Sequence, residues 1–349
     1  MYLQAVYKII KAALWKGIKS IELGDIPKPT ITAPNNAIIH ITHYTIYGSD
    51  LYIYNSDLNR VIEKGLIIGR KAIGIVKEVG PLIKNIKLGD RVIILPIIAY
   101  GDYFYCKRKE YSLYDRTNPS KKLDYSLITG GYTGDQAEYC RVPNADLTYV
   151  KAPRDIAATK LVGLANVTPT AWHGYKLADI GKGDIVGVWG YSAVGLSIQC
   201  FAKLRGARRV YAIDKDANRL DITESFGIIP ININNHPAPA DYILSIKPHG
   251  LDRAIEASGF RSTRSATHTA IRALGVKGDS SDAIYSAIKA TRKGGTIALI
   301  GDFFYTTNNF PIEMLIEKAI TLRRGRLYAQ KSYSDFFSHK LPGGLKLSC

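Results

Sequence analysis

A strand–turn–helix–strand segment in the second half of the chain constrains the fold more than any other feature. Residues 185–189 form a short, fully apolar run, and a glycine-rich turn at 190–195 follows it directly. A helical pattern then leads to a second apolar run, 209–213, which ends at Asp214. Two strands joined through a helix lie parallel in one sheet with a right-handed crossover. Because the alternation continues over 217–300, the sequence predicts a doubly wound, parallel α/β domain.

The glycine-rich turn has the form of a dinucleotide-binding fingerprint with one substitution. Its first glycine is Gly190 and its last is Gly195, which Val194 precedes, but Ser192 stands where the fingerprint has its middle glycine. Backbone N–H groups at such a helix start bind a pyrophosphate, helped by the helix dipole. A side chain at the middle position is expected to weaken that binding.

Asp214 indicates which dinucleotide the turn would bind. It lies 19 residues after Gly195, at a strand end, where a carboxylate accepts a hydrogen bond from a ribose 2′-OH. A carboxylate would repel a 2′-phosphate, so the sequence favours NAD over NADP, although Lys215 follows directly and would soften that preference. We therefore expect weakened NAD binding; the alternative is a sheet turn that holds no ligand.

The first half of the sequence predicts a β-rich domain. Short runs of strand-forming residues, at 37–42, 72–79 and 91–98, are separated by Gly, Pro and Asn turn signals. Residues 116–134 are polar and glycine-rich, and we expect a surface loop there. No apolar run reaches the roughly 18 residues of a membrane span. No signal peptide is evident either, so we expect a cytoplasmic protein.

The net charge of +17 raises the question of an anionic partner. No basic run of five or six residues, RNA-binding motif or zinc-finger spacing accompanies it, so we do not expect nucleic-acid binding. The four cysteines have no close spacing, which argues against a disulfide framework. A basic surface without a specific partner is the simpler interpretation.

A series of short motifs resembles the zinc-type medium-chain alcohol dehydrogenases. It comprises Gly48-Ser49-Asp50-Leu51, the run from Gly69 to Gly80, and Gly89-Asp90-Arg91-Val92. Residues 125–138, the Gly190 turn and Arg292-Lys293-Gly294-Gly295 are similar to the glutathione-independent formaldehyde dehydrogenase branch. The resemblance covers about residues 11–338.

This resemblance implies a fold and an activity. We expect a β-rich GroES-like catalytic domain at 1–161, a Rossmann cofactor domain at 162–304, and a shortened return to the catalytic domain at 305–349. The family is an NAD-dependent oxidoreductase family acting on small alcohols or aldehydes, and its members assemble as homo-oligomers.

Most zinc-ligand positions of that family carry other residues here. The family has a Cys, a His-Glu pair and an Asp at its catalytic zinc, and the matching positions hold Tyr47, Arg70, Lys71 and Asn166. Zinc takes thiolate, imidazole and carboxylate ligands. A phenol, a guanidinium, an ammonium and an amide do not suit it, so we expect no catalytic zinc.

The four-cysteine loop that binds the family's structural zinc is reduced in the same way. Its positions hold Tyr100, Tyr103, Cys106 and Tyr114, with the spacing intact. One thiolate does not build a tetrahedral site. We therefore expect no structural zinc.

These replacements share a direction. Cys to Tyr, Glu to Lys, Asp to Asn and Gly to Ser are each one G-to-A transition, although His to Arg at position 70 is not. Such a bias would raise the number of lysines and tyrosines. It would account for the 23 tyrosines of the chain and for much of its positive charge. We infer a gene altered by directional mutation; an excess of A and T at silent codon positions would support it, and its absence would remove the main support.

Two side chains are candidates for the chemistry that remains. Ser49 keeps the hydroxyl that starts a proton relay in intact relatives; a helix-capping role is the alternative. His173 is a candidate general acid, although a structural histidine is the simpler interpretation. Three functions stay open: a weak or zinc-independent NAD-linked oxidoreductase, a non-catalytic relative that binds a nucleotide or a partner, and a basic binding protein.

Overall fold

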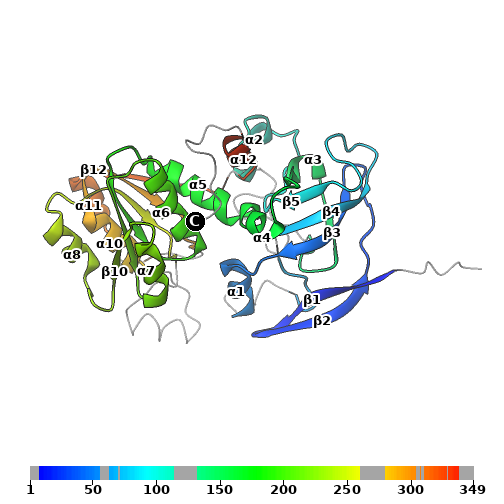
Figure 1. The fold of residues 1–349 in the computed structure, drawn as a ribbon, viewed down its shortest axis with the longest axis horizontal. Helices are drawn as coiled ribbons and strands as arrows, with labels where there is room; N and C mark the ends of the chain where they lie inside the picture. The colour runs from blue at the N-terminus through cyan, green and yellow to red at the C-terminus, as the bar shows by residue number, and fades with distance from the viewer. Residues whose placement is uncertain are drawn as a thin grey trace, which may run out of the picture. The chain divides into compact units, whose positions relative to one another are not determined.

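The computed structural model describes residues 8–55, 63–69, 71–113, 132–259, 280–303, 307, 310–327 and 329–337. These residues divide into two compact units (Figure 1). The first unit contains the described residues within Met1–Pro169 and Arg326–Leu341, and the second contains those within Thr170–Gly325.

The first unit is built on an antiparallel sheet. Its described strands pair in the order β6 (Tyr139–Val142), β3 (Ala37–Tyr44), β4 (Ala72–Val79), β5 (Arg91–Ile94), β7 (Tyr149–Lys151). The buried face of these strands is apolar, with Ile39, Ile41, Val76, Val92 and Ile94 in one core cluster. A separate hairpin consists of β1 (Ile9–Gly17) and β2 (Ser20–Pro27), which Figure 1 draws in blue.

Short helices join these strands and extend the first unit. They are α1 (Gly48–Tyr54), α2 (Phe104–Lys107), α3 (Ala145–Thr148), α4 (Ala158–Leu161) and α12 (Ala329–Phe337). The last helix returns from the far end of the chain and is fixed by side chains. Gln330 Nε2 donates to the carbonyls of Ile97 and Leu147, at 2.9 Å and 3.2 Å, and the Tyr333 hydroxyl donates to the carbonyl of Leu164.

The second unit is built on a parallel sheet. Its described strands pair in the order β10 (Ile229–Asn232), β9 (Arg209–Asp214), β8 (Ile185–Trp189), β11 (Leu251–Glu256), β12 (Thr291–Leu299), β13 (Thr321–Arg324). The strand order reverses between β8 and β11. Ligands of such doubly wound sheets bind at this switch point, outside the carboxyl ends of the strands.

Helices connect the parallel strands. They are α6 (Ala193–Leu204), α7 (Ala217–Glu224), α8 (Pro239–Ile246), α10 (Asp282–Ala290) and α11 (Ile312–Glu317), while α5 (Val167–Ala178) precedes β8. The predicted α/β fold, a β-rich part followed by a doubly wound parallel sheet, is confirmed. No helix among the described residues has the length and apolar character needed to cross a membrane.

Several element bounds differ from the sequence prediction for physical reasons. Strands β4 and β8 have the predicted bounds, but the strand expected over 91–98 ends at Ile94. Pro96 follows two residues later, and proline has no N–H to donate to a ladder. Most of the loop expected over 116–134, and the tail from residue 338, lie outside the described residues.

Candidate functional site

A buried charged cluster surrounds Lys71 in the first unit. Only 1% of the Lys71 side chain is exposed, directly before β4. Its Nζ donates to Ser49 Oγ at 3.1 Å and lies 3.6 Å from Asp50 Oδ2. The same nitrogen lies 4.4 Å from the centroid of the Tyr47 ring, which is a cation–π distance. The structure therefore brings together three of the positions singled out in the sequence.

The start of α1 holds the partners of Lys71 in place. Tyr47 is the N-cap residue of this helix, and Asp50 Oδ2 accepts a hydrogen bond from the Tyr47 N–H at 2.7 Å. This bond closes the first turn and places the ring of Tyr47, the hydroxyl of Ser49 and the carboxylate of Asp50 around one point. A carboxylate in the first turn also suits the positive end of the helix dipole.

Asp135 adds a second buried carboxylate that the sequence analysis missed. It is fully buried, and neither carboxylate oxygen has a hydrogen bond of normal geometry within the described residues. Burial raises the pKa of Asp135 to about 7; the Lys71 ammonium opposes this rise, and the Asp50 carboxylate adds to it. The sequence signal for this carboxylate is Lys71 itself, because a lysine at a buried position next to an apolar strand needs a buried anion nearby.

Gly69 allows the close approach of this carboxylate. Its φ is +103°, and a Cβ built on it would lie 2.3 Å from Asp135 Oδ1. No side chain fits there, so the glycine before the Arg70-Lys71 pair is required by packing. Arg70 itself lies outside the described residues, and Asn166 is buried immediately before α5.

The described positions that match the family's structural-zinc loop lie in an aromatic cluster. Cys106 is buried on α2 and packs with Ala99, while Tyr100, Tyr103, Tyr111 and Leu147 pack against this pair. The hydroxyls of Tyr100 and Tyr132 lie 2.8 Å apart and share a hydrogen bond. Burial, together with the neighbouring Cys106, raises the pKa of Tyr111. Ring packing therefore organises this loop; Tyr114 lies outside the described residues.

The glycine-rich turn of the second unit needs glycine at both ends. Gly190 has a φ of +97°, and a Cβ on it would lie 2.7 Å from the backbone nitrogen of Ser258. A Cβ on Gly195 would lie 2.0 Å from the carbonyl oxygen of Gly190. The two close approaches fix the backbone path from β8 into α6, which is the path that leads N–H groups towards a bound phosphate.

Ser192 acts as a helix cap in this turn. It is the N-cap residue of α6, and its Oγ accepts a hydrogen bond from the Gly195 N–H at 3.4 Å. The first N–H groups of a helix have no partner within it. The serine therefore occupies the Gly195 N–H, which is one of the N–H groups at the start of this helix.

Asp214 links the end of β9 to the glycine-rich turn. Its Oδ2 accepts from the Tyr191 N–H at 2.6 Å, and its Oδ1 accepts from the N–H groups of Lys215 and Asp216, at 2.7 Å and 3.0 Å. A carboxylate offers about four acceptor positions. Three are filled here, so about one is left for a hydroxyl group.

His173 belongs to the second unit and lies on α5. Its side chain is buried, and a Cβ on Gly325 would lie 3.4 Å from its Nε2. The imidazole thus packs against the backbone that follows β13. Its role as a general acid stays a prediction.

The pKa of Asp135 predicts how stability depends on pH. A carboxyl whose pKa is higher in the folded state than in the unfolded state favours folding below the unfolded value, near 4, and this contribution is lost as the pH rises through about 7. We expect the free energy of unfolding to fall over this range, by on the order of a few kcal/mol. Urea denaturation of Asp135→Asn at pH 5 to 8 should show a much smaller fall.

Asp90→Asn provides the matched control for this measurement. Burial raises the pKa of Asp90, but the Lys87 N–H and the Lys151 ammonium outweigh that effect and lower it below the ordinary value. Its contribution is therefore lost only as the pH falls through that lowered pKa, so the control should keep the pH dependence of the unchanged chain between pH 5 and 8. An equal pH dependence in Asp135→Asn would contradict the assignment.

Known proteins with similar sequences identify the family of this chain. The model of the alcohol dehydrogenase GroES-like domain family matches residues 33–153. A zinc-type alcohol dehydrogenase-like protein of Schizosaccharomyces pombe is 36% identical over 338 residues, covering 93% of this chain and 80% of that protein. A glutathione-independent formaldehyde dehydrogenase of Pseudomonas aeruginosa is 28% identical, covering 72% of this chain and 66% of that protein.

The fold comparison gives the same result. The solved structure of alcohol dehydrogenase TADH from Thermus sp. ATN1 matches with a TM-score of 0.79 at 25% identity, covering 95% of this chain and 89% of that one. The chain therefore belongs to the zinc-type alcohol dehydrogenase family of oxidoreductases.

Proposed function

We propose that this chain is an NAD-binding member of the family that has lost the zinc-dependent oxidation of small alcohols and aldehydes. The observation that carries the proposal is the place of the Lys71 ammonium. It occupies a position that the resemblance assigns to the catalytic zinc site, and it is enclosed by Ser49, Asp50 and the ring of Tyr47.

The residues at this position do not fit a zinc ion. An ammonium has no lone pair to give, and its charge repels a dication placed beside it. Tyr47 turns the face of its ring towards Lys71, so it serves the cation as an aromatic neighbour. Asp50 is held by the Tyr47 N–H and faces the same ammonium. No catalytic step through zinc is therefore part of the proposed function.

The dinucleotide site fits its ligand better than the metal site does. It presents the N–H groups at the start of α6, the two end glycines of the turn, and one remaining acceptor position on Asp214. The dinucleotide would supply hydride-transfer chemistry when bound. The Asp214 carboxylate would repel a 2′-phosphate, which favours NAD over NADP.

The geometry also limits what catalysis is left. Lys71 and Asp50 are buried, and their charges already meet each other, so neither is available to stabilise a charge that develops on a substrate. We therefore propose that reduction of a carbonyl by NADH is zinc-independent and slow. The second candidate, a non-catalytic protein that binds the nucleotide alone, is favoured by the same enclosure of Lys71.

Zinc content tests the loss of the metal. After washing with a chelator, the chain should hold well below one zinc ion and should bind NADH, measured by elemental analysis and by fluorescence titration. The matched control restores all four family residues together: Tyr47→Cys, Arg70→His, Lys71→Glu and Asn166→Asp. This variant should take up about one zinc, because it supplies thiolate, imidazole and carboxylate ligands.

The two parts of the proposal fail separately. About one zinc in the unchanged chain, together with turnover of an alcohol, would overturn the loss of zinc chemistry. No binding of NADH at millimolar concentration would overturn the dinucleotide site. Binding without any carbonyl reduction would leave the non-catalytic candidate.

Because Ser192 caps α6, we expect its replacement by glycine to raise the affinity for NADH. Ser192→Gly removes the side chain from the phosphate position and frees the Gly195 N–H, so NADH should bind several-fold more tightly, roughly 1 kcal/mol. The cost in unfolding free energy should be only a few tenths of a kcal/mol, since glycine is itself an acceptable N-cap.

Ser192→Ala separates the two effects. It also frees the Gly195 N–H but keeps a side chain at the close approach, and it should cost about 1 kcal/mol of stability through loss of the cap. Titration with NADH should show a larger gain for glycine than for alanine. Equal affinity in all three chains would show that position 192 does not limit binding.

A further inference from the structure

Glu256 is a fully buried carboxylate at the carboxyl end of β11. One of its oxygens, Oε1, accepts three hydrogen bonds from Ser258 and Gly259, in the loop that follows the strand. The donors are the Ser258 N–H at 2.9 Å, the Ser258 hydroxyl at 2.5 Å and the Gly259 N–H at 2.7 Å. This side chain therefore determines the path of the backbone as it leaves the strand.

That loop forms one wall of the glycine-rich turn. Gly190 approaches Ser258 so closely that a Cβ on Gly190 would lie 2.7 Å from the Ser258 nitrogen. The Ala257 N–H donates to the carbonyl of Trp189, the last residue of β8, at 2.8 Å. A shift of residues 257–259 would therefore move the turn that leads into α6.

Glu256 also joins β11 to the end of β12. Its backbone carbonyl accepts from the N–H groups of Ile300 and Gly301, at 2.8 Å and 3.0 Å. Its second carboxylate oxygen, Oε2, lies where a side chain on Gly301 would stand, because a Cβ built there would lie 2.4 Å from it. A longer residue at 301 would push the carboxylate away from its three donors.

These contacts span the point where the strand order reverses. Strands β8 and β11 are the two neighbours on either side of the switch point, and dinucleotides bind in the crevice outside their carboxyl ends. The phosphate-binding N–H groups start at the same place. Backbone hydrogen bonds of residues 256 and 257 join the ends of β8, β11 and β12, and the Glu256 carboxylate holds the loop that follows, at the edge of that crevice.

We propose that Glu256 is a positioning residue of the dinucleotide site, which holds the Gly190 turn in its binding geometry through residues 257–259. The inference rests on the proposed binding of NAD and deepens it. Glu256 does not touch the ligand in this scheme. It acts through the position of its Oε1 acceptor, and its negative charge is not what the site requires.

Two substitutions separate position from charge. Glu256→Gln keeps an oxygen acceptor at the place of Oε1 and removes the charge, so NADH should bind within about threefold of the unchanged chain. Glu256→Asp keeps the charge and withdraws the acceptor by one methylene, so NADH should bind about tenfold more weakly. Affinity is measured by fluorescence titration, and urea denaturation of each chain establishes that it is folded.

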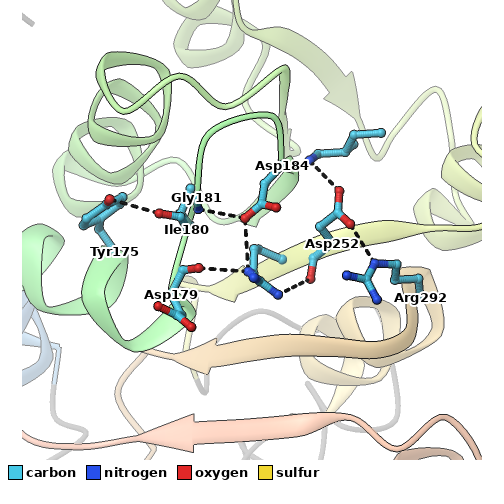
Figure 2. Close-up of polar contacts among 9 residues, drawn as sticks. Tyr175, Asp179, Ile180, Gly181, Asp184, Asp252 and Arg292 are labelled. Carbon is cyan, nitrogen blue, oxygen red and sulfur yellow. Dashed lines mark hydrogen bonds and ion pairs between the residues drawn. The ribbon is translucent and has the colours of Figure 1, made fainter.

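Asp252 provides the control at the opposite end of the same strand. Its Oδ2 accepts from the Ile185 N–H at 2.8 Å and its Oδ1 from Arg292 Nε at 2.6 Å, in the network with Asp184 that Figure 2 shows. Asp252→Ala breaks comparable bonds at the amino end of β11. It should lower the free energy of unfolding and leave the affinity for NADH unchanged, because it lies away from the carboxyl edge.

Hydrogen exchange gives a readout that does not need the cofactor. Amides of residues 190–195 should exchange faster in Glu256→Asp than in Glu256→Gln or Asp252→Ala. If the unchanged chain does not bind NADH, the proposed function fails and exchange alone decides the role of Glu256. Equal exchange and equal affinity in the Asp and Gln variants, or weaker binding by the Gln variant alone, would overturn the inference.

Discussion

A buried ammonium needs negative charge and acceptors around it, and Lys71 imposes this requirement on the first unit. Ser49, Asp50 and the ring of Tyr47 meet it directly, and the Asp135 carboxylate adds to it from another part of the chain. Removing one partner of a buried ion pair costs about 3–5 kcal/mol, because the other charge is left uncompensated. Replacing Lys71 or Tyr47 alone by a zinc ligand would break this balance, so under the proposed function a metal site would return only through several changes together.

The sequence predicted one part of this cluster and missed another. Tyr47, Ser49 and Lys71 stood at recognisable motif positions, so their grouping followed from the resemblance. Asp135 lies far along the chain from Lys71, in a segment that was used only to identify the family, and the fold brings the two together. Contacts of this kind depend on how the sheet registers its strands, which no local pattern encodes. The aromatic packing around Cys106 was missed for a different reason: the tyrosines there were interpreted only as lost zinc ligands.

The elements of the fold were predictable where one periodicity dominated. Strand β8 is a continuous apolar run between Asp184 and Gly190, and β4 starts with an apolar run directly after Lys71 and ends before Gly80; the bounds of both were predicted. Strand β10 has only four residues, including Pro230, and lies parallel to β9 at the edge of the sheet. Tertiary pairing creates such a strand, because its own residues favour a turn as much as a strand.

The two candidate sites respond differently to replaced side chains because they are made of different groups. A zinc site consists of side-chain donors, and each replacement removes a ligand outright. A dinucleotide site consists mainly of backbone N–H groups at a helix start, which survive any substitution that keeps the backbone path. Here the path is kept by Gly190, Gly195 and the loop that Glu256 holds, while the altered Ser192 changes only one N–H. Under the proposed function, the same changes to the sequence would therefore remove the metal chemistry first and leave nucleotide binding in place longest.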